Sequence, residues 1–181
     1  MPQIQKMLQA KGITFADVGL LAVCCGPGSF TGVRSSISAA KAFSLARPEM
    51  AVTGVSAFEA YMHAVDDFEL AAYNAVIIET KREDFYIQLF DKELNRLTPP
   101  QALAYDDILP LLRNKKVSLI GDGVERFLNR PSGLSLHCIK MPENLDIDLL
   151  VKAGLKHYQN KRLDYPKPLY LRAPDVSAPK N

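Results

Sequence analysis

A run rich in glycine and hydroxyl residues, placed between two regular segments, is the part of the sequence best suited to bind a ligand. Residues 26–34 read GPGSFTGVR and follow residues 18–25, a short uncharged segment typical of a buried strand. Residues 35–45 follow without glycine or proline and favour a helix. A turn into a helix start leaves backbone N–H groups free, and the helix dipole favours an anion there. The candidate phosphate or nucleotide site therefore comprises Gly26, Gly28, Ser29, Thr31, Gly32 and Arg34.

The spacing of this run does not match two common nucleotide fingerprints. Its glycines are one residue too far apart for the dinucleotide pattern, and the Lys-Ser/Thr pair of a P-loop does not follow. A structural interpretation stands beside the phosphate one, since glycine permits a tight turn that lets strand and helix pack closely. It predicts that a Cβ is costly at Gly28 and Gly32, and that Ser29 or Thr31 caps the helix.

Other catalytic arrangements have little support. His63, His137 and His157 are far apart and lack the spacing that places two imidazoles on one helix face, so we expect no metal site. No histidine lies near the hydroxyls of the glycine run to activate a nucleophile, and we expect no catalytic residue. Phosphoryl transfer needs carboxylates to hold Mg²⁺, and the acidic candidates are Glu79 and Asp122.

The motif GPGSFTGVR resembles the signature of the TsaB (YeaZ) family, which serves the synthesis of threonylcarbamoyladenosine in tRNA. Further matching pieces follow in the family's order over nearly the whole chain: GVS at 54–56, ETKREDFY at 79–86, GDG at 121–123 and PLYLR at 168–172. The resemblance implies an α/β protein with the actin-like ATPase fold (ASKHA, RNase H-like) and two lobes. Family members usually begin with strands that precede the point where this sequence starts, so we expect a first lobe truncated at its N-terminus.

The expected organisation is an N-terminal actin-like lobe over 1–70, a C-terminal α/β lobe over 71–165, and an extended tail over 166–181. The boundary is indicated by Asp66 and Asp67, and the tail by its prolines at 166, 168, 174 and 179. The patterns predict helices at 2–11, 35–45, 56–64, 106–113 and 145–159, and strands at 75–78, 85–90, 117–120 and 136–139. Ser56 and Glu59 form a capping box, and Asp106 is the expected cap of its helix.

A partner surface is predicted on the first two helices. Small residues in 35–45 would let another helix approach closely, and apolar residues add contact area. The predicted interface residues are Ile4, Met7, Leu8, Val33, Ile37 and Ala40. A buried face of the chain's own core is the alternative. In the TsaB family these helices resemble the interface that joins TsaB to itself or to TsaD, the catalytic subunit.

Composition narrows the class of protein. The chain of 181 residues is 48% hydrophobic and 23% charged, with a net charge of +2, too small to indicate nucleic-acid binding by itself. No apolar run approaches the roughly eighteen residues of a membrane span. Cys24, Cys25 and Cys138, in a chain without a visible export signal, indicate reduced thiols and a cytoplasmic location.

The resemblance implies a non-catalytic subunit that pairs with TsaD in the machine that adds a threonylcarbamoyl group to an adenosine beside the tRNA anticodon. Its partners would be TsaD and the ATPase TsaE, with a homodimer in their absence and tRNA bound through the complex. No intrinsic cofactor is expected, and ATP and Mg²⁺ would act only in the assembled complex. The alternatives are a nucleotide-dependent phosphotransferase or ATPase of the actin-like superfamily and, with less support, a glycoprotease-type peptidase. A weak aromatic and basic pattern at 82–86 contains two acidic residues, which oppose phosphate binding.

Overall fold

The computed structural model describes residues 2–65, 69–141 and 146–172. The expected lobe boundary at Asp66 and Asp67, the helix start at 145 and the tail prolines at 174 and 179 lie outside the described residues. The elements are α1 (Pro2–Ala10), the 3-10 helix η1 (Phe15–Asp17), β1 (Leu20–Cys24), α2 (Phe30–Ala46), β2 (Ala51–Val55), α3 (Ala57–Met62), β3 (Tyr73–Glu79), β4 (Asp84–Phe90), β5 (Gln101–Ala104), α4 (Tyr105–Leu112), β6 (Val117–Ile120), α5 (Val124–Leu128), β7 (Leu136–Cys138) and α6 (Ile147–Gln159).

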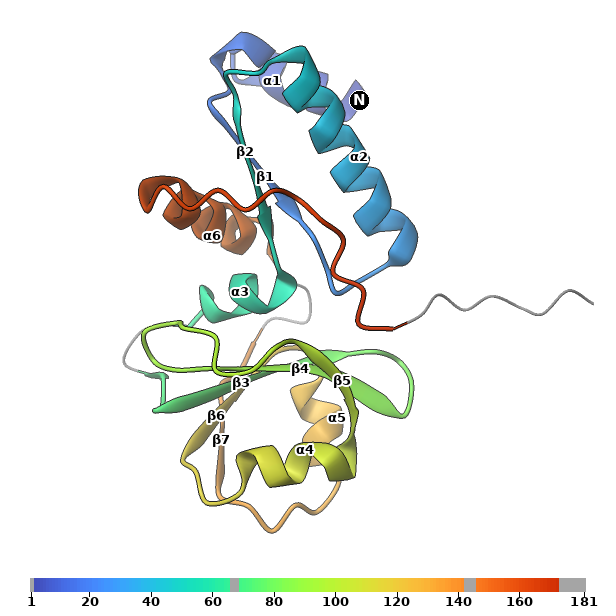
Figure 1. The fold of residues 1–181 in the computed structure, drawn as a ribbon, viewed down its shortest axis with the longest axis vertical. Coiled ribbons are helices and arrows are strands. Elements are labelled where there is room, and N and C mark those ends of the chain that lie inside the picture. The colour runs from blue at the N-terminus through green and yellow to red at the C-terminus, as the bar shows by residue number, and fades with distance from the viewer. Residues whose placement is uncertain (1, 66–68, 142–145, 173–181) are drawn as a thin grey trace, which may run out of the picture.

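The first sheet consists of the parallel strands β1 and β2. Helix α2 covers one face of the pair and α6 the other, as Figure 1 shows. Parallel strands need cover on both faces, and the apolar side chains of β1 alternate between the two helices. Val23 packs against Val33 and Ile37 of α2, whereas Ala22 packs beneath α6. Although α6 falls within 71–165, it therefore packs against the first sheet.

The second sheet has five strands in the order β5-β4-β3-β6-β7. The pairs β3–β4 and β4–β5 are antiparallel, and β3–β6 and β6–β7 are parallel. One face packs against α4 and α5 around Phe85 and Phe127, and the other against α3 around Phe58 and Phe90. Figure 1 shows α3 between the two sheets, where it contacts both parts of the molecule.

Most predicted elements are confirmed within a few residues. Strand β6 has the predicted bounds, and β3 and β4 contain the predicted strands at 75–78 and 85–90. The capping box is present: Ser56 Oγ accepts a hydrogen bond from the N–H of Glu59, whose carboxylate accepts one from the N–H of Ser56, both at 3.1 Å. The predicted cap at Asp106 is wrong, because Ala104 is the N-cap and Asp106 lies in the first turn of α4.

Four elements were not predicted: η1, β2, β5 and α5. Each has five residues or fewer, which leaves little periodicity to recognise. Within the described ranges, no helix has the length and apolar character needed to cross a membrane.

Candidate functional site

The glycine run forms a tight turn between β1 and α2, in contact with two distant segments. Gly26 has a φ of +100°, and the peptide bond to Pro27 is cis. The carbonyl of Gly26 accepts a hydrogen bond from the N–H of Ala57 at 2.8 Å, and the preceding carbonyl of Cys25 accepts one from Leu169 at 2.8 Å. A Cβ at Gly26 would lie 3.3 Å from the carbonyl oxygen of Leu169. Gly26 is therefore the position in this run that requires glycine.

The expectation that Gly28 and Gly32 require glycine is wrong. A Cβ at Gly28 would have no atom within 4 Å, and one at Gly32 would make an ordinary contact of 3.5 Å with Ser29. Neither has a positive φ. The expected cap is confirmed for Ser29, whose Oγ accepts a hydrogen bond from the N–H of Gly32 at 3.3 Å, whereas Thr31 lies within the first turn.

Arg34 lies against an aromatic pair beside the turn. Its Nε donates a hydrogen bond to the hydroxyl of Tyr170 at 3.0 Å, and its guanidinium lies 4.2 Å from the ring centroid of Phe30. The rings of Phe30 and Tyr170 stack at 4.8 Å. Gly28, Ser29, Thr31, Gly32 and Arg34 are exposed and Gly26 is buried. Phosphate binding by these residues stays a prediction.

The two acidic candidates for phosphoryl transfer lie together at one end of the second sheet. The carboxylate of Asp122 accepts a hydrogen bond from the N–H of Glu79 at 3.0 Å, and the carboxylate of Glu79 accepts one from Arg126 Nε at 2.6 Å. Burial raises the pKa of Asp122, and the charge of Glu79 adds to the shift. Burial acts in the same direction on Glu79, but the Arg126 hydrogen bond lowers its pKa overall. Both carboxylates are thus engaged by groups of the chain itself.

Two of the three histidines, His63 and His157, border the same cavity although they are distant in sequence, and His137 lies on β7. His63 ends α3, His137 is exposed on β7, and His157 is buried on α6. Among the described residues, no three histidine, cysteine or carboxylate side chains converge on a point where a metal ion could bind. His157 Nδ1 lies 3.1 Å from Thr53 Oγ1, and its Nε2 lies 3.4 Å from the carboxylate of Glu59, so it connects β2 to α3.

Glu59 is the centre of a charged cluster that sequence reasoning missed. Its carboxylate accepts hydrogen bonds from Arg96 at 2.7 Å and from Arg162 at 3.2 Å, beside His157. Burial alone would raise the pKa of Glu59, but the hydrogen bond and charge of Arg96, helped by Ser56, lower it to about 2. The capping box identified Glu59, but neither arginine is near it in sequence. The cluster borders a cavity of about 150 Å³ between α3, α6 and the turn after β4.

The predicted partner surface is divided by the fold. Ile4 and Met7 are 39% and 68% exposed, and α1 has no buried residue. Val33, Ile37 and Ala40 are instead buried, at 8%, 3% and 2% exposure. Their expected exposure is wrong, because this face of α2 packs on β1. Leu8 is half-buried, so the predicted interface residues that remain open to a partner are Ile4 and Met7 on α1.

The solved structures that resemble this chain define its fold class. YeaZ from Pseudomonas aeruginosa matches with a TM-score of 0.71 and 20% identity, over 94% of this chain and 81% of that one. The crystal structure of an uncharacterized protein similar to peptidase YEAZ, from Pseudomonas aeruginosa, matches with a TM-score of 0.69 and 20% identity. The match covers 94% of this chain and 82% of that one. At this identity the likeness shows the fold alone. The chain is an α/β protein of the actin-like class.

Sequence comparison gives the family. The model described as "TsaD: tRNA N6-adenosine threonylcarbamoyltransferase" matches residues 1–170. The chain belongs to this family, and the named proteins that it resembles are TsaB (YeaZ) proteins. A curated relative, the tRNA threonylcarbamoyladenosine biosynthesis protein TsaB of Buchnera aphidicola subsp. Baizongia pistaciae (strain Bp), is 24% identical over 180 residues, which are 94% of this chain and 80% of the relative.

Proposed function

We propose that the chain is a non-catalytic subunit of the cytoplasmic complex that adds a threonylcarbamoyl group to the adenosine beside the tRNA anticodon. Its partner in that complex is TsaD, the subunit that carries the catalytic site. Membership of the threonylcarbamoyltransferase family and the biosynthetic role for which the TsaB relative is named support the pathway. TsaE is the second partner, and tRNA binds to the assembled complex.

The observation that carries the partner role is the exposed apolar face of α1. Ile4 and Met7 are one turn apart on a nine-residue helix that buries no residue in its own chain. Burial of an apolar face normally supplies most of the stability of so short a helix. A helix of TsaD that covers Ile4 and Met7 would bury this face and so stabilise α1. Phe15 packs against Phe43 at 4.6 Å between ring centroids, which ties the segment after α1 to α2.

The exposed side of α2 suits the same partner. Ser35, Ser38 and Ala42 are exposed on it, and small side chains permit a short distance between helix axes. In the absence of TsaD the same surface would join two copies of the chain, since a two-fold axis uses one surface twice. ATP and Mg²⁺ are handled in the assembled complex, and the chain supplies no cofactor of its own.

Reconstitution tests this function. Purified TsaD, TsaE and tRNA, with ATP and the threonylcarbamoyl precursor substrates, are incubated with and without the chain, and modified adenosine is measured by mass spectrometry. Modification should require the chain, and the chain alone should show negligible ATP turnover and no peptidase activity. Robust ATP turnover by the chain alone, abolished by Asp122→Asn, would favour the phosphotransferase alternative.

The matched variants lie on opposite faces of α1. Met7→Glu places a charge in the proposed contact and should abolish modification in the mixture. Gln9→Glu adds the same charge on the other face of the helix and should leave modification intact. Because Met7 and Gln9 are both exposed, neither change should reduce the melting temperature of the isolated chain. Equal activity of both variants would show that the contact lies elsewhere.

A further inference from the structure

An extended C-terminal segment, residues 160–172, runs from the end of α6 across the first sheet to the start of α2 (Figure 1). Two backbone hydrogen bonds fix it to the sheet: the N–H of Gly54 donates to the carbonyl of Asp164 at 2.7 Å, and the N–H of Leu169 donates to the carbonyl of Cys25 at 2.8 Å. Side chains on this segment therefore occupy defined positions beside α2.

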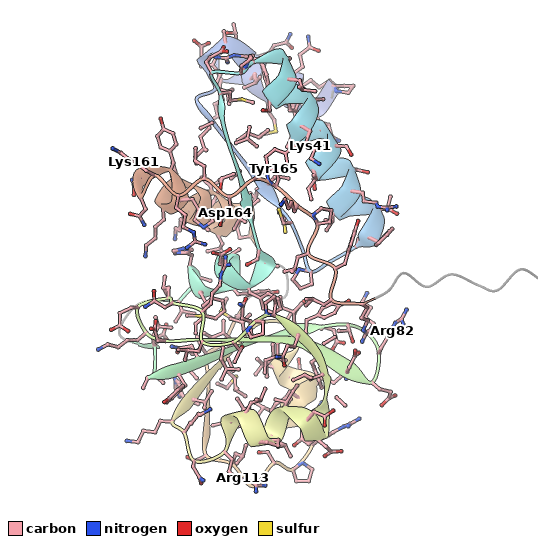
Figure 2. All side chains as sticks on the ribbon, viewed as in Figure 1. Lys41, Arg82, Arg113, Lys161, Asp164 and Tyr165 are labelled. Carbon is pink, nitrogen blue, oxygen red and sulfur yellow. The ribbon has the colours of Figure 1, made fainter. Side chains whose placement is uncertain are left out.

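Three exposed aromatic rings lie along this contact between the C-terminal segment and α2. Phe30, Tyr165 and Tyr170 are 36%, 63% and 44% exposed. Phe30 and Tyr170 stack on each other at the start of α2, and Tyr165 lies 5.4 Å from the ammonium group of Lys41 near its middle. Figure 2 shows Tyr165 beside Lys41 on one side of the molecule. Aromatic rings left in solvent offer flat surfaces on which other rings can stack.

Three cations accompany these rings. Arg34, Lys41 and Lys167 are exposed, and none of them forms an ion pair with a carboxylate within the part of the chain that the structure describes. Two carboxylates lie near Tyr165 and Lys167, and both are already paired: Asp164 with Arg162 at 3.1 Å, and Glu59 with Arg96 at 2.7 Å. The surface of α2 and the C-terminal segment therefore carries uncompensated positive charge between exposed rings.

We propose that Phe30, Arg34, Lys41, Tyr165, Lys167 and Tyr170 form a surface that binds a single-stranded part of an RNA directly. Unpaired cations that follow a line of exposed rings match a phosphate backbone whose bases stack on the rings. This inference rests on the proposed function in taking tRNA as the RNA and its anticodon loop as the single-stranded part. An apolar protein partner would leave the three cations without counter-charges, so the RNA is favoured.

Fluorescence anisotropy of a labelled anticodon stem-loop RNA, titrated with the full chain, tests the surface. With three phosphate contacts, the affinity should fall about twenty-fold between 50 and 200 mM salt, and with two contacts only about seven-fold. Lys41→Ala and Lys167→Ala should therefore each weaken binding and reduce its salt dependence. Lys152→Ala is the matched control, because Lys152 is an exposed lysine on α6, on the opposite side of the first sheet.

The stacking contribution is tested separately at fixed salt. Tyr165→Ala should weaken binding at least about five-fold, since one base–ring contact contributes roughly 1–3 kcal/mol. Tyr165→Phe keeps the ring and should bind like the parent chain. A fully paired duplex of the same sequence, whose bases cannot stack on the protein, should bind more weakly than the stem-loop.

Two results would overturn the proposal. One is the absence of binding to the stem-loop at low salt, and the other is an equal loss of affinity in Lys41→Ala and Lys152→Ala, which would mean diffuse charge attraction. If Lys41→Ala and Tyr165→Ala instead lost association with TsaD while RNA binding was absent, the surface would be a protein interface. Because the chain alone is titrated, failure here is distinguishable from failure of the TsaD partnership, which is measured without RNA.

Discussion

Gly154 of α6 lies directly against Ala22 of β1, so closely that a Cβ at Gly154 would be 2.5 Å from the Cβ of Ala22. The methyl group of Ala22 is short and fixed to the strand, so it cannot move aside as the end of a long side chain could. This contact sets how closely α6 approaches the first sheet. It also explains why a glycine occurs inside a helix, where it is otherwise unfavourable.

Substitution of Gly154 should therefore destabilise the fold, although alanine has a higher helix propensity than glycine. In an exposed helix, glycine to alanine is stabilising by about 1 kcal/mol. Here Gly154→Ala should instead destabilise by about 1–3 kcal/mol, because the added methyl group forces α6 away from β1. Thermal or urea unfolding, with Lys152→Ala as the exposed control on the same helix, measures the difference. A higher melting temperature for Gly154→Ala would disprove this close contact.

The glycine run offers a second matched pair. Gly26→Ala should destabilise by about 1–2 kcal/mol or more, because φ is +100° there and a Cβ would approach the carbonyl of Leu169. Gly28→Ala should be neutral or slightly stabilising, since the site is open and its φ is ordinary. Urea unfolding of both variants measures the two changes in the free energy of unfolding. Equal destabilisation would contradict the assignment of the turn's strained position to Gly26.

Stability at low pH should depend on Glu59. The pKa of Glu59 in the folded chain is about 2, below its ordinary value of 4.5. Its ionised form therefore stabilises the fold above about pH 4.5, and that contribution is lost as the pH falls from 4.5 toward 2. Glu59→Gln should cost about 1–3 kcal/mol at neutral pH, because Arg96 and Arg162 lose their carboxylate.

The difference between the parent chain and Glu59→Gln should shrink across that pH interval. Urea unfolding at pH 7, 5, 4 and 3 provides the comparison. A gap that stayed constant with pH would mean that the glutamate contributes by packing alone.

Asp122 should behave in the opposite way. Its pKa is raised, by burial first and by the charge of Glu79, so the ionised form is disfavoured in the fold above its ordinary pKa. Asp122→Asn can still accept the hydrogen bond from Glu79 and should leave stability at pH 7 unchanged or higher. It should also leave the reconstituted modification reaction intact. Loss of that reaction in a folded variant would give Asp122 a chemical role.

Local sequence signals predicted the regular elements well. The short uncharged segment of β6, between Lys116 and Gly121, gave its bounds, and the capping box located the start of α3. The glycine run was correctly placed between a strand and a helix. Which of its glycines is strained was not predictable, because the sign of φ at Gly26 follows from contacts with Ala57 and Leu169, far along the chain.

Long-range packing accounts for the other differences. An apolar helix face in the sequence indicates that the face is buried, but not whether it packs against a partner protein or against a strand of the same chain. Val33 and Ile37 therefore looked like interface residues, although β1 covers them. The cluster of Glu59 with Arg96 and Arg162 spans 103 residues of sequence between Glu59 and Arg162, a distance over which no spacing rule operates.

Direct binding to TsaD tests the central claim most directly. Sedimentation velocity of the chain mixed with purified TsaD should show a complex for the parent chain and for Gln9→Glu, and separate species for Met7→Glu. All three proteins should have the same melting temperature, which excludes unfolding as the cause. The absence of a complex with the parent chain, or a complex that Met7→Glu leaves unchanged, would contradict the account.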